Sequence, residues 1–162
     1  MTEIIETRSP EETEALGRRL AETASPGDII CLNGELGVGK TVFVKGFSKG
    51  LGITEPVVSP TFTILQEYHE GRLPMYHFDV YRIEDPSEME EVGIDEYFYG
   101  DGVSLIEWAG LIAEMIPRRA VRIQIEKGPE KGDDYRRITL YRPEAEEERL
   151  RMNREKGGRF SC

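Results

Sequence analysis

The chain has 162 residues, which is enough for one domain with a substantial core and too few for two ordinary domains. Charged residues make up 32% and hydrophobic residues 38% of the chain, as in soluble globular proteins. The net charge of −10 argues against a broad nonspecific grip on nucleic acid, because neutralisation of phosphates by Lys and Arg dominates such binding.

Cysteine usage and hydropathy indicate the compartment. The two cysteines, Cys31 and Cys162, are too few for a disulfide framework or a metal cluster. No apolar run approaches the length of a membrane span, and the polar N-terminus lacks the apolar region of a signal peptide. We therefore expect a cytoplasmic protein without a membrane partner.

The first elements are a short edge strand within residues 1–7 and a helix that follows it. Ser9 is predicted to cap this helix, with Pro10 in the first turn and Glu12 three residues after the cap. The helix is expected to end near residues 25–27, where Ser, Pro and Gly follow one another.

A strand–loop–helix unit follows, and its loop carries the phosphate-loop pattern G-x-x-x-x-G-K-[ST]. The apolar run at 28–32 predicts a buried strand, and 41–51 predicts a helix with one apolar face. Glycines allow backbone N–H groups to form a nest for phosphate oxygens, and the helix N-terminus favours the same anion. A glycine-rich turn without function is the alternative, and the full motif in this context disfavours it. The fixed positions are Gly34, Gly39, Lys40 and Thr41.

The middle of the chain predicts an antiparallel hairpin, with strands at 63–69 and 75–81 around a turn at 70–74, so we expect a mixed sheet. Before it, the stretch 57–63 is extended and interrupted by Pro60. Thr61 in this stretch resembles a switch threonine that senses a γ-phosphate, although a Pro-bearing turn explains it equally well.

Two acidic residues are candidates to complete a metal site beside the phosphate loop. Glu107 ends the apolar strand 103–107, which would place it at the carboxyl edge of the sheet. Asp79 lies in the second hairpin strand, where alternation puts His77, Asp79 and Tyr81 on one face. A solvated strand end for Glu107 and a packed histidine for His77 are the alternatives, and the pattern leaves open which carboxylate touches a metal.

The remaining segments predict short helices at 87–91, 95–99 and 111–115, and two strands at 121–126 and 137–141 that close the sheet. Residues 143–162 form a charged tail, predicted to be partly helical or disordered, after a single domain at 1–142. The chain has no Asn-Lys-x-Asp run for guanine and no arginine-rich kinase lid. An ATPase that serves another reaction is favoured, with a small-molecule kinase or a nucleotide-dependent adaptor as alternatives.

Four separated motifs together resemble the TsaE family, the small bacterial ATPases of tRNA threonylcarbamoyladenosine synthesis. They are Gly34 to Thr41, Ser59 to Phe62, Tyr76 to Arg82, and Ile106-Glu107-Trp108, and the resemblance covers roughly residues 5 to 142. Val38 stands where the family frequently has alanine, which should only add bulk beside the loop.

The resemblance implies an α/β phosphate-loop fold of three layers with a mixed, mostly parallel sheet, and ATP and Mg²⁺ as ligands. It also implies slow ATP hydrolysis that resets the TsaB–TsaD complex, which modifies adenosine 37 of tRNA. The protein would then contact tRNA only indirectly, through that complex. The residues implied to hold the nucleotide are Leu36, Gly37, Val38, Gly39, Lys40 and Thr41, with Thr13 and Arg136 nearby. Thr41 and Glu107 would ligate Mg²⁺, Asp79 would orient water, Thr61 would sense the γ-phosphate, and Trp108, His77 and Tyr81 would lie beside the site.

Overall fold

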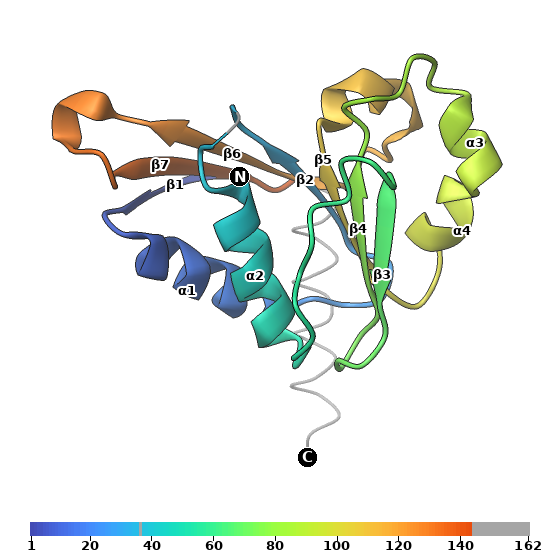
Figure 1. Cartoon of the computed structure of the whole chain (residues 1–162), viewed down its shortest axis with the longest axis horizontal. Helices are drawn as coiled ribbons and strands as arrows, with labels where there is room; N and C mark the ends of the chain where they lie inside the picture. The colour runs from blue at the N-terminus through green and yellow to red at the C-terminus, as the bar shows by residue number, and fades with distance from the viewer. Residues whose placement is uncertain (36, 144–162) are drawn as a thin grey trace.

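The computed structural model describes residues 1–35 and 37–143, and within them a seven-stranded sheet carries helices on both faces (Figure 1). The strands are β1 (Thr2–Thr7), β2 (Ile29–Asn33), β3 (Leu65–Tyr68), β4 (Met75–Asp79), β5 (Val103–Glu107), β6 (Val121–Lys127) and β7 (Arg136–Tyr141). The helices are α1 (Pro10–Glu22), α2 (Lys40–Gly50), α3 (Glu88–Val92) and α4 (Ile94–Phe98), with 3₁₀ helices η1 (Ala109–Met115) and η2 (Pro129–Lys131). The predicted tail lies outside the described residues from position 144 onward.

The strand order is β1-β7-β6-β2-β5-β4-β3. Strands β6, β2, β5 and β4 pair in parallel, while β7 pairs antiparallel with both β6 and β1, and β3 pairs antiparallel with β4. The mixed sheet and the β3–β4 hairpin are confirmed, and five of the seven described strands run in one direction. Strand β7 is antiparallel to β6 because their connection is short, and a parallel return requires a crossover of a dozen or more residues.

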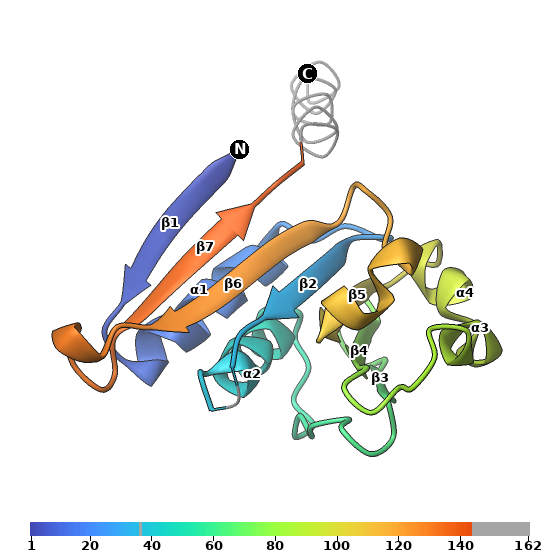
Figure 2. The same cartoon turned by 90° about the horizontal axis from the view of Figure 1, so that it is seen from above.

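The sheet separates two hydrophobic cores, which confirms the three-layer arrangement (Figure 2). In β2, Ile30 and Leu32 face the core under α1 and α2, while Ile29 and Cys31 face the core under α3, α4 and η1. Because all four side chains are buried, the sequence of β2 is continuously apolar and does not alternate between apolar and polar residues.

Helices α1 and α2 pack closely and thereby fix the helix that follows the phosphate loop. The predicted start of α1 is confirmed, since Ser9 Oγ accepts a hydrogen bond from Glu12 N at 3.2 Å. At Gly46 of α2, a Cβ atom would overlap the backbone oxygen of Glu14 in α1. Only glycine allows this approach of the two backbones.

Strand β3 is shorter than predicted at both ends, whereas β4 begins where predicted and ends two residues early. Strand β3 begins at Leu65, after Ile64 adopts a left-handed φ of 70°. Strand β4 ends at Asp79, whose Oδ1 accepts a hydrogen bond from Tyr81 N at 3.0 Å and so forms a turn. The prediction that Tyr81 continues the strand face of His77 and Asp79 is therefore wrong.

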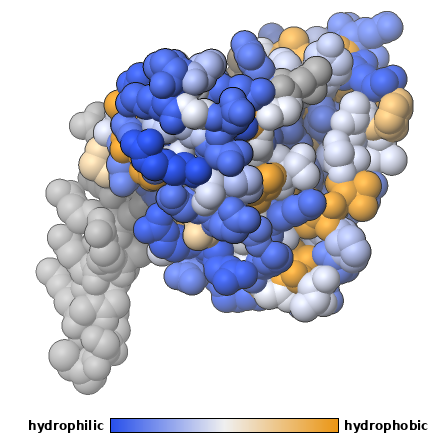
Figure 3. Space-filling view, turned by 60° about the vertical axis from the view of Figure 1, so that its left-hand side comes forward, coloured by the Kyte–Doolittle hydropathy of each residue, from blue (hydrophilic) through white to orange (hydrophobic). Residues whose placement is uncertain are grey.

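Hydrophilic residues predominate on the face shown in Figure 3, and the hydrophobic residues there form small separate groups. Among the described residues, no helix is long and apolar enough to cross a membrane.

Candidate functional site

The phosphate-loop motif lies between the end of β2 and the start of α2. Gly39, which precedes α2, has a left-handed φ of 112°, and Gly37 has a φ of 75°. No atom lies within 4 Å of a Cβ built on either residue, so this side of the loop faces open space. At Gly34, by contrast, a Cβ would lie 2.8 Å from the Ile125 carbonyl oxygen, so the loop leaves β2 in close contact with β6. Leu36, a predicted phosphate-binding residue, lies outside the described residues.

Lys40 and Glu107 meet at the carboxyl edge of the parallel strands. Lys40 Nζ lies 3.8 Å from Glu107 Oε1, and His77 Nε2 lies 2.7 Å from Glu107 Oε2. All three residues are buried, so water screens these contacts little. Glu107 is thus part of a buried polar network, and the alternative of a solvated strand end does not hold.

The second candidate carboxylate is adjacent to the first, because Asp79 of β4 pairs in register with Glu107 of β5. Asp79 Oδ2 accepts a hydrogen bond from the Thr61 hydroxyl at 3.1 Å, and the Ser59 and Thr61 hydroxyls lie 2.8 Å apart. The extended stretch 57–63 is therefore tied to the strand that carries Asp79. Ser59 begins one of the four sequence motifs, but no role of its own was predicted for it, because one hydroxyl beside a proline gives little signal.

Trp108 directly follows β5 and contacts two predicted site residues. Lys40 Nζ lies 4.3 Å from the centroid of its ring, and the Tyr81 ring centroid lies 4.9 Å from it. Trp108 has a left-handed backbone, with φ 63° and ψ 31°. For a bulky residue this conformation costs about 1–2 kcal/mol, and such strain is concentrated at functional sites.

A cleft with an empty volume of about 700 Å³ opens over these groups. It is lined by Gly37, Gly39, Lys40, Thr41, Val42, Ser59, Thr61, Asp79, Glu107 and Trp108. It therefore brings together a glycine-rich loop, a buried ammonium, a hydroxyl and two carboxylates. These groups fit a phosphate chain with Mg²⁺, which is commonly held by one or two carboxylates together with phosphate oxygens.

A neighbouring cleft of about 410 Å³ shares Gly37, Gly39 and Val42 with the first and contains Thr13 and Arg136. Arg136 Nε donates to the Val38 carbonyl at 2.6 Å, so this arginine braces the loop. Thr13 Oγ1 lies 2.8 Å from Thr7 Oγ1 and is buried. Pro10 and Asp134 also line this cleft; the sequence marks Pro10 only as part of the helix start, and no motif marks Asp134.

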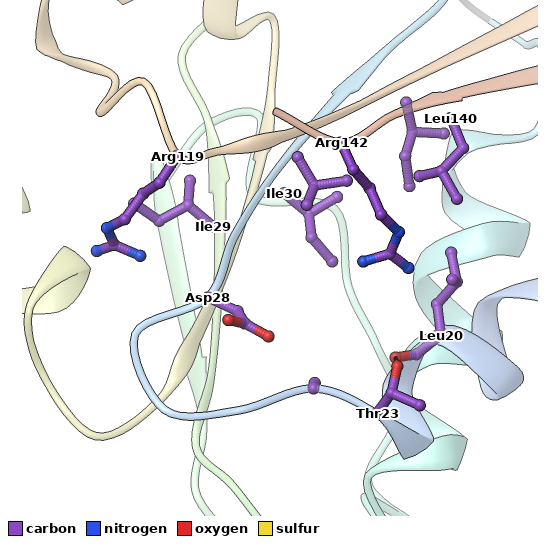
Figure 4. Close-up of a pocket in the computed structure, with 11 residues that line it drawn as sticks. Leu20, Thr23, Asp28, Ile29, Ile30, Arg119, Leu140 and Arg142 are labelled. Atoms are coloured by element: carbon purple, nitrogen blue, oxygen red, sulfur yellow. Dashed lines mark hydrogen bonds between the residues drawn. The ribbon is translucent and has the colours of Figure 1, made fainter. Parts of the chain in front are cut away.

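A third, small cavity, with a volume of about 30 Å³, lies at the start of β2, at the opposite end of that strand from the loop (Figure 4). Its walls are largely aliphatic, and Asp28, Arg119 and Arg142 are its charged lining residues. Arg119 bonds to the carbonyl oxygens of Gly27 and Phe98. None of the predicted site residues lines this cavity.

The fold and the site define a small α/β protein with a phosphate-loop motif at the carboxyl edge of its parallel strands. The chain belongs to the TsaE family, because the family model described as threonylcarbamoyl adenosine biosynthesis protein TsaE matches residues 7–138.

Relatives of known name agree with this assignment. The tRNA threonylcarbamoyladenosine biosynthesis protein TsaE of Bacillus subtilis is 55% identical over 134 residues, which cover 83% of this chain and 82% of that protein. The protein of the same name from Treponema pallidum is 42% identical, covering 83% of this chain and 96% of that one. The crystal structure of YdiB from Bacillus subtilis matches with a TM-score of 0.78 and 43% identity, over 100% of this chain and 97% of the other.

Proposed function

We propose that this protein is a Mg²⁺-dependent ATPase of tRNA N6-threonylcarbamoyladenosine formation, with low intrinsic activity. The observation that carries the proposal is the buried contact, at 3.8 Å, between Lys40 at the start of α2 and Glu107 at the end of β5, the parallel neighbour of β2. This edge of an α/β sheet is where ligands usually bind.

In this proposal each residue has a distinct role. The backbone of residues 37–41 cradles the phosphates, and Lys40 neutralises charge on the β- and γ-phosphates. The Thr41 hydroxyl and Glu107 hold Mg²⁺, which when bound neutralises charge on the phosphate oxygens. Thr13 and Arg136 border the rest of the nucleotide.

Two further residues act at the terminal phosphate. Asp79 orients the attacking water, and its hydrogen bond with Thr61 connects that carboxylate to the stretch 57–63, with Thr61 as the phosphate sensor. His77 holds Glu107 from the oxygen that does not face Lys40.

The partners in this proposal are the TsaB and TsaD proteins, whose complex the ATPase resets between turnovers in the cytoplasm. Direct binding to tRNA is disfavoured, because a chain of net charge −10 repels phosphates. We therefore expect contact with tRNA only through the complex.

The first prediction concerns reconstitution of threonylcarbamoyladenosine formation from purified TsaB, TsaD and this protein. We expect multiple turnover only when this protein is present, with ATP hydrolysis that is weak alone and rises with the partners. Glu107→Gln keeps the size of the side chain and removes the metal-binding charge, so turnover should fall about 100-fold or more. Glu114→Gln, an exposed carboxylate in η1, is the control. Continued multiple turnover without this protein would contradict the proposed role.

The bond between Thr61 and Asp79 also favours a second candidate, a nucleotide-dependent adaptor that acts without significant hydrolysis. The same reconstitution separates the two. If Glu107→Gln abolishes hydrolysis but still supports multiple turnover with ATP, the adaptor is the correct reading.

A further inference from the structure

Lys40 and Glu107 have opposite charges in a buried site, yet they do not form a full ion pair. Their closest contact is 3.8 Å, whereas charge-assisted hydrogen bonds between an ammonium and a carboxylate are about 2.7–2.9 Å long. The Lys40 ammonium stands at the end of a flexible four-carbon side chain, which is long enough to approach Glu107 Oε1 more closely. A second attractive contact to the ammonium accounts for this distance.

The indole of Trp108 supplies such a contact. Its ring centroid lies 4.3 Å from Lys40 Nζ, within the range of a cation–π contact, and Trp is the strongest aromatic partner for a cation. Because Trp108 directly follows Glu107, the same short segment supplies both the carboxylate and the ring. The left-handed backbone of Trp108 allows two consecutive side chains to approach the same ammonium.

We propose that Trp108 is a positioning residue which holds the Lys40 ammonium short of a full ion pair with Glu107. This leaves Lys40 able to neutralise phosphate and Glu107 able to ligate a cation. Without the ring, Lys40 closes onto Glu107, and phosphate must then break a buried ion pair before it can bind. The inference rests on the proposed function only in taking the ligand to be a nucleoside polyphosphate.

Tyr81 extends the same contact to the surface. Its ring packs on Trp108 with a centroid distance of 4.9 Å, and 52% of Tyr81 is exposed. A protein that packs against Tyr81 therefore acts on the ring that sets the position of Lys40. This gives a physical route by which a partner could raise a low intrinsic activity.

The test measures the affinity of the full-length protein for N-methylanthraniloyl-ADP without divalent cations. Trp108→Leu should weaken binding about tenfold, and Trp108→Phe about threefold, because the contact scales with the ring. In a Glu107→Gln background the loss from Trp108→Leu should shrink to less than about twofold, since the competing charge is gone. The affinity for AMP, measured by competition, should change little in Trp108→Leu, because AMP lacks the phosphates that Lys40 reaches.

A packing role for Trp108 predicts different results. It would give an equal loss in the Glu107→Gln background and an equal loss for AMP, and either result would overturn the proposal. Thermal unfolding of each variant shows whether the fold is retained, and Leu111→Ala, at an exposed apolar residue of η1, is the matched control.

A second measurement needs no nucleotide, because Trp108 is the single tryptophan of the chain. The emission of Trp108 should differ between the wild type and Lys40→Met, in which the charge beside the ring is lost. Identical emission in the wild type and in Lys40→Met would show that the ammonium does not contact the indole, and it would contradict the proposal. If neither protein binds any nucleotide, the proposed function fails while this measurement still decides the contact.

Discussion

At the scale of single residues, burial determines how much a histidine–carboxylate contact contributes to stability. The chain has two histidines, and each places Nε2 against a glutamate. His77 is 2% exposed and lies 2.7 Å from Glu107, whereas the His69 side chain is 62% exposed and lies 3.3 Å from Glu67. Water and salt screen the second contact and not the first.

We predict that His77→Ala lowers the free energy of unfolding by about 3 kcal/mol, because it opens a cavity and removes a donor from a buried carboxylate. His69→Ala should change it by less than about 0.5 kcal/mol. Urea unfolding followed by circular dichroism measures both.

A double-mutant cycle shows how much of the His77 effect depends on the charge of Glu107. In a Glu107→Gln background the cost of His77→Ala should be smaller by about 1–2 kcal/mol, since a neutral amide loses less when it lacks a partner. Equal costs in both backgrounds would mean that His77 contributes packing alone.

At the scale of elements, the close packing of α1 and α2 fixes the helix that begins with Lys40. Gly17 of α1 and Gly46 of α2 each approach the backbone of the opposite helix so closely that a Cβ would overlap it. The contact connects the phosphate-loop helix to the helix that carries Thr13, so both neighbouring clefts depend on it.

We predict that Gly46→Ala destabilises the protein by about 2–3 kcal/mol, because the new methyl group forces the helices apart. The higher helix propensity of Ala offsets only about 1 kcal/mol of that strain. Gly110→Ala is the control, since no atom lies within 4 Å of a Cβ built there. Chemical denaturation should place the Gly110 variant within about 0.5 kcal/mol of the wild type; similar losses in both variants would remove the close-packing explanation.

At the scale of the whole molecule, a thiol in the core makes stability depend on alkaline pH. Burial raises the pKa of the Cys31 thiol to about 11, an effect that the charge of Arg122 partly offsets. Burial favours the neutral thiol in the folded state, so the unfolded chain releases the thiol proton at a lower pH than the folded chain does. The stabilisation is therefore complete below pH 9 and is lost as the pH rises from about 9 towards 11.

We predict that the wild type loses about 2–3 kcal/mol of stability from this thiol across that range. Cys31→Ala lacks the titrating group, so the difference in free energy of unfolding between wild type and variant should shrink as the pH rises. Urea titrations at pH 8, 9.5 and 10.5 measure this difference. A constant difference would show that Cys31 does not titrate in this range.

The sequence by itself determined the elements whose signals are local. The phosphate loop between β2 and α2, the Ser9 cap of α1 and the strand that ends in Glu107 were all predicted at the right places. Each depends on hydrogen bonds or periodicity within a few neighbouring residues, which a pattern can report. The family assignment followed from the order of four such patterns.

The tertiary structure alone decided which side chains meet at the site. Arg136 braces the carbonyl of Val38 from 98 residues away, and His77 reaches Glu107 from 30 residues away. Strand β4 ends at Asp79, so Tyr81 leaves the sheet and packs on Trp108 instead. These contacts depend on strand order and on a left-handed backbone at Trp108, and periodicity along the chain reports neither, because both are set by residues that pack from distant segments.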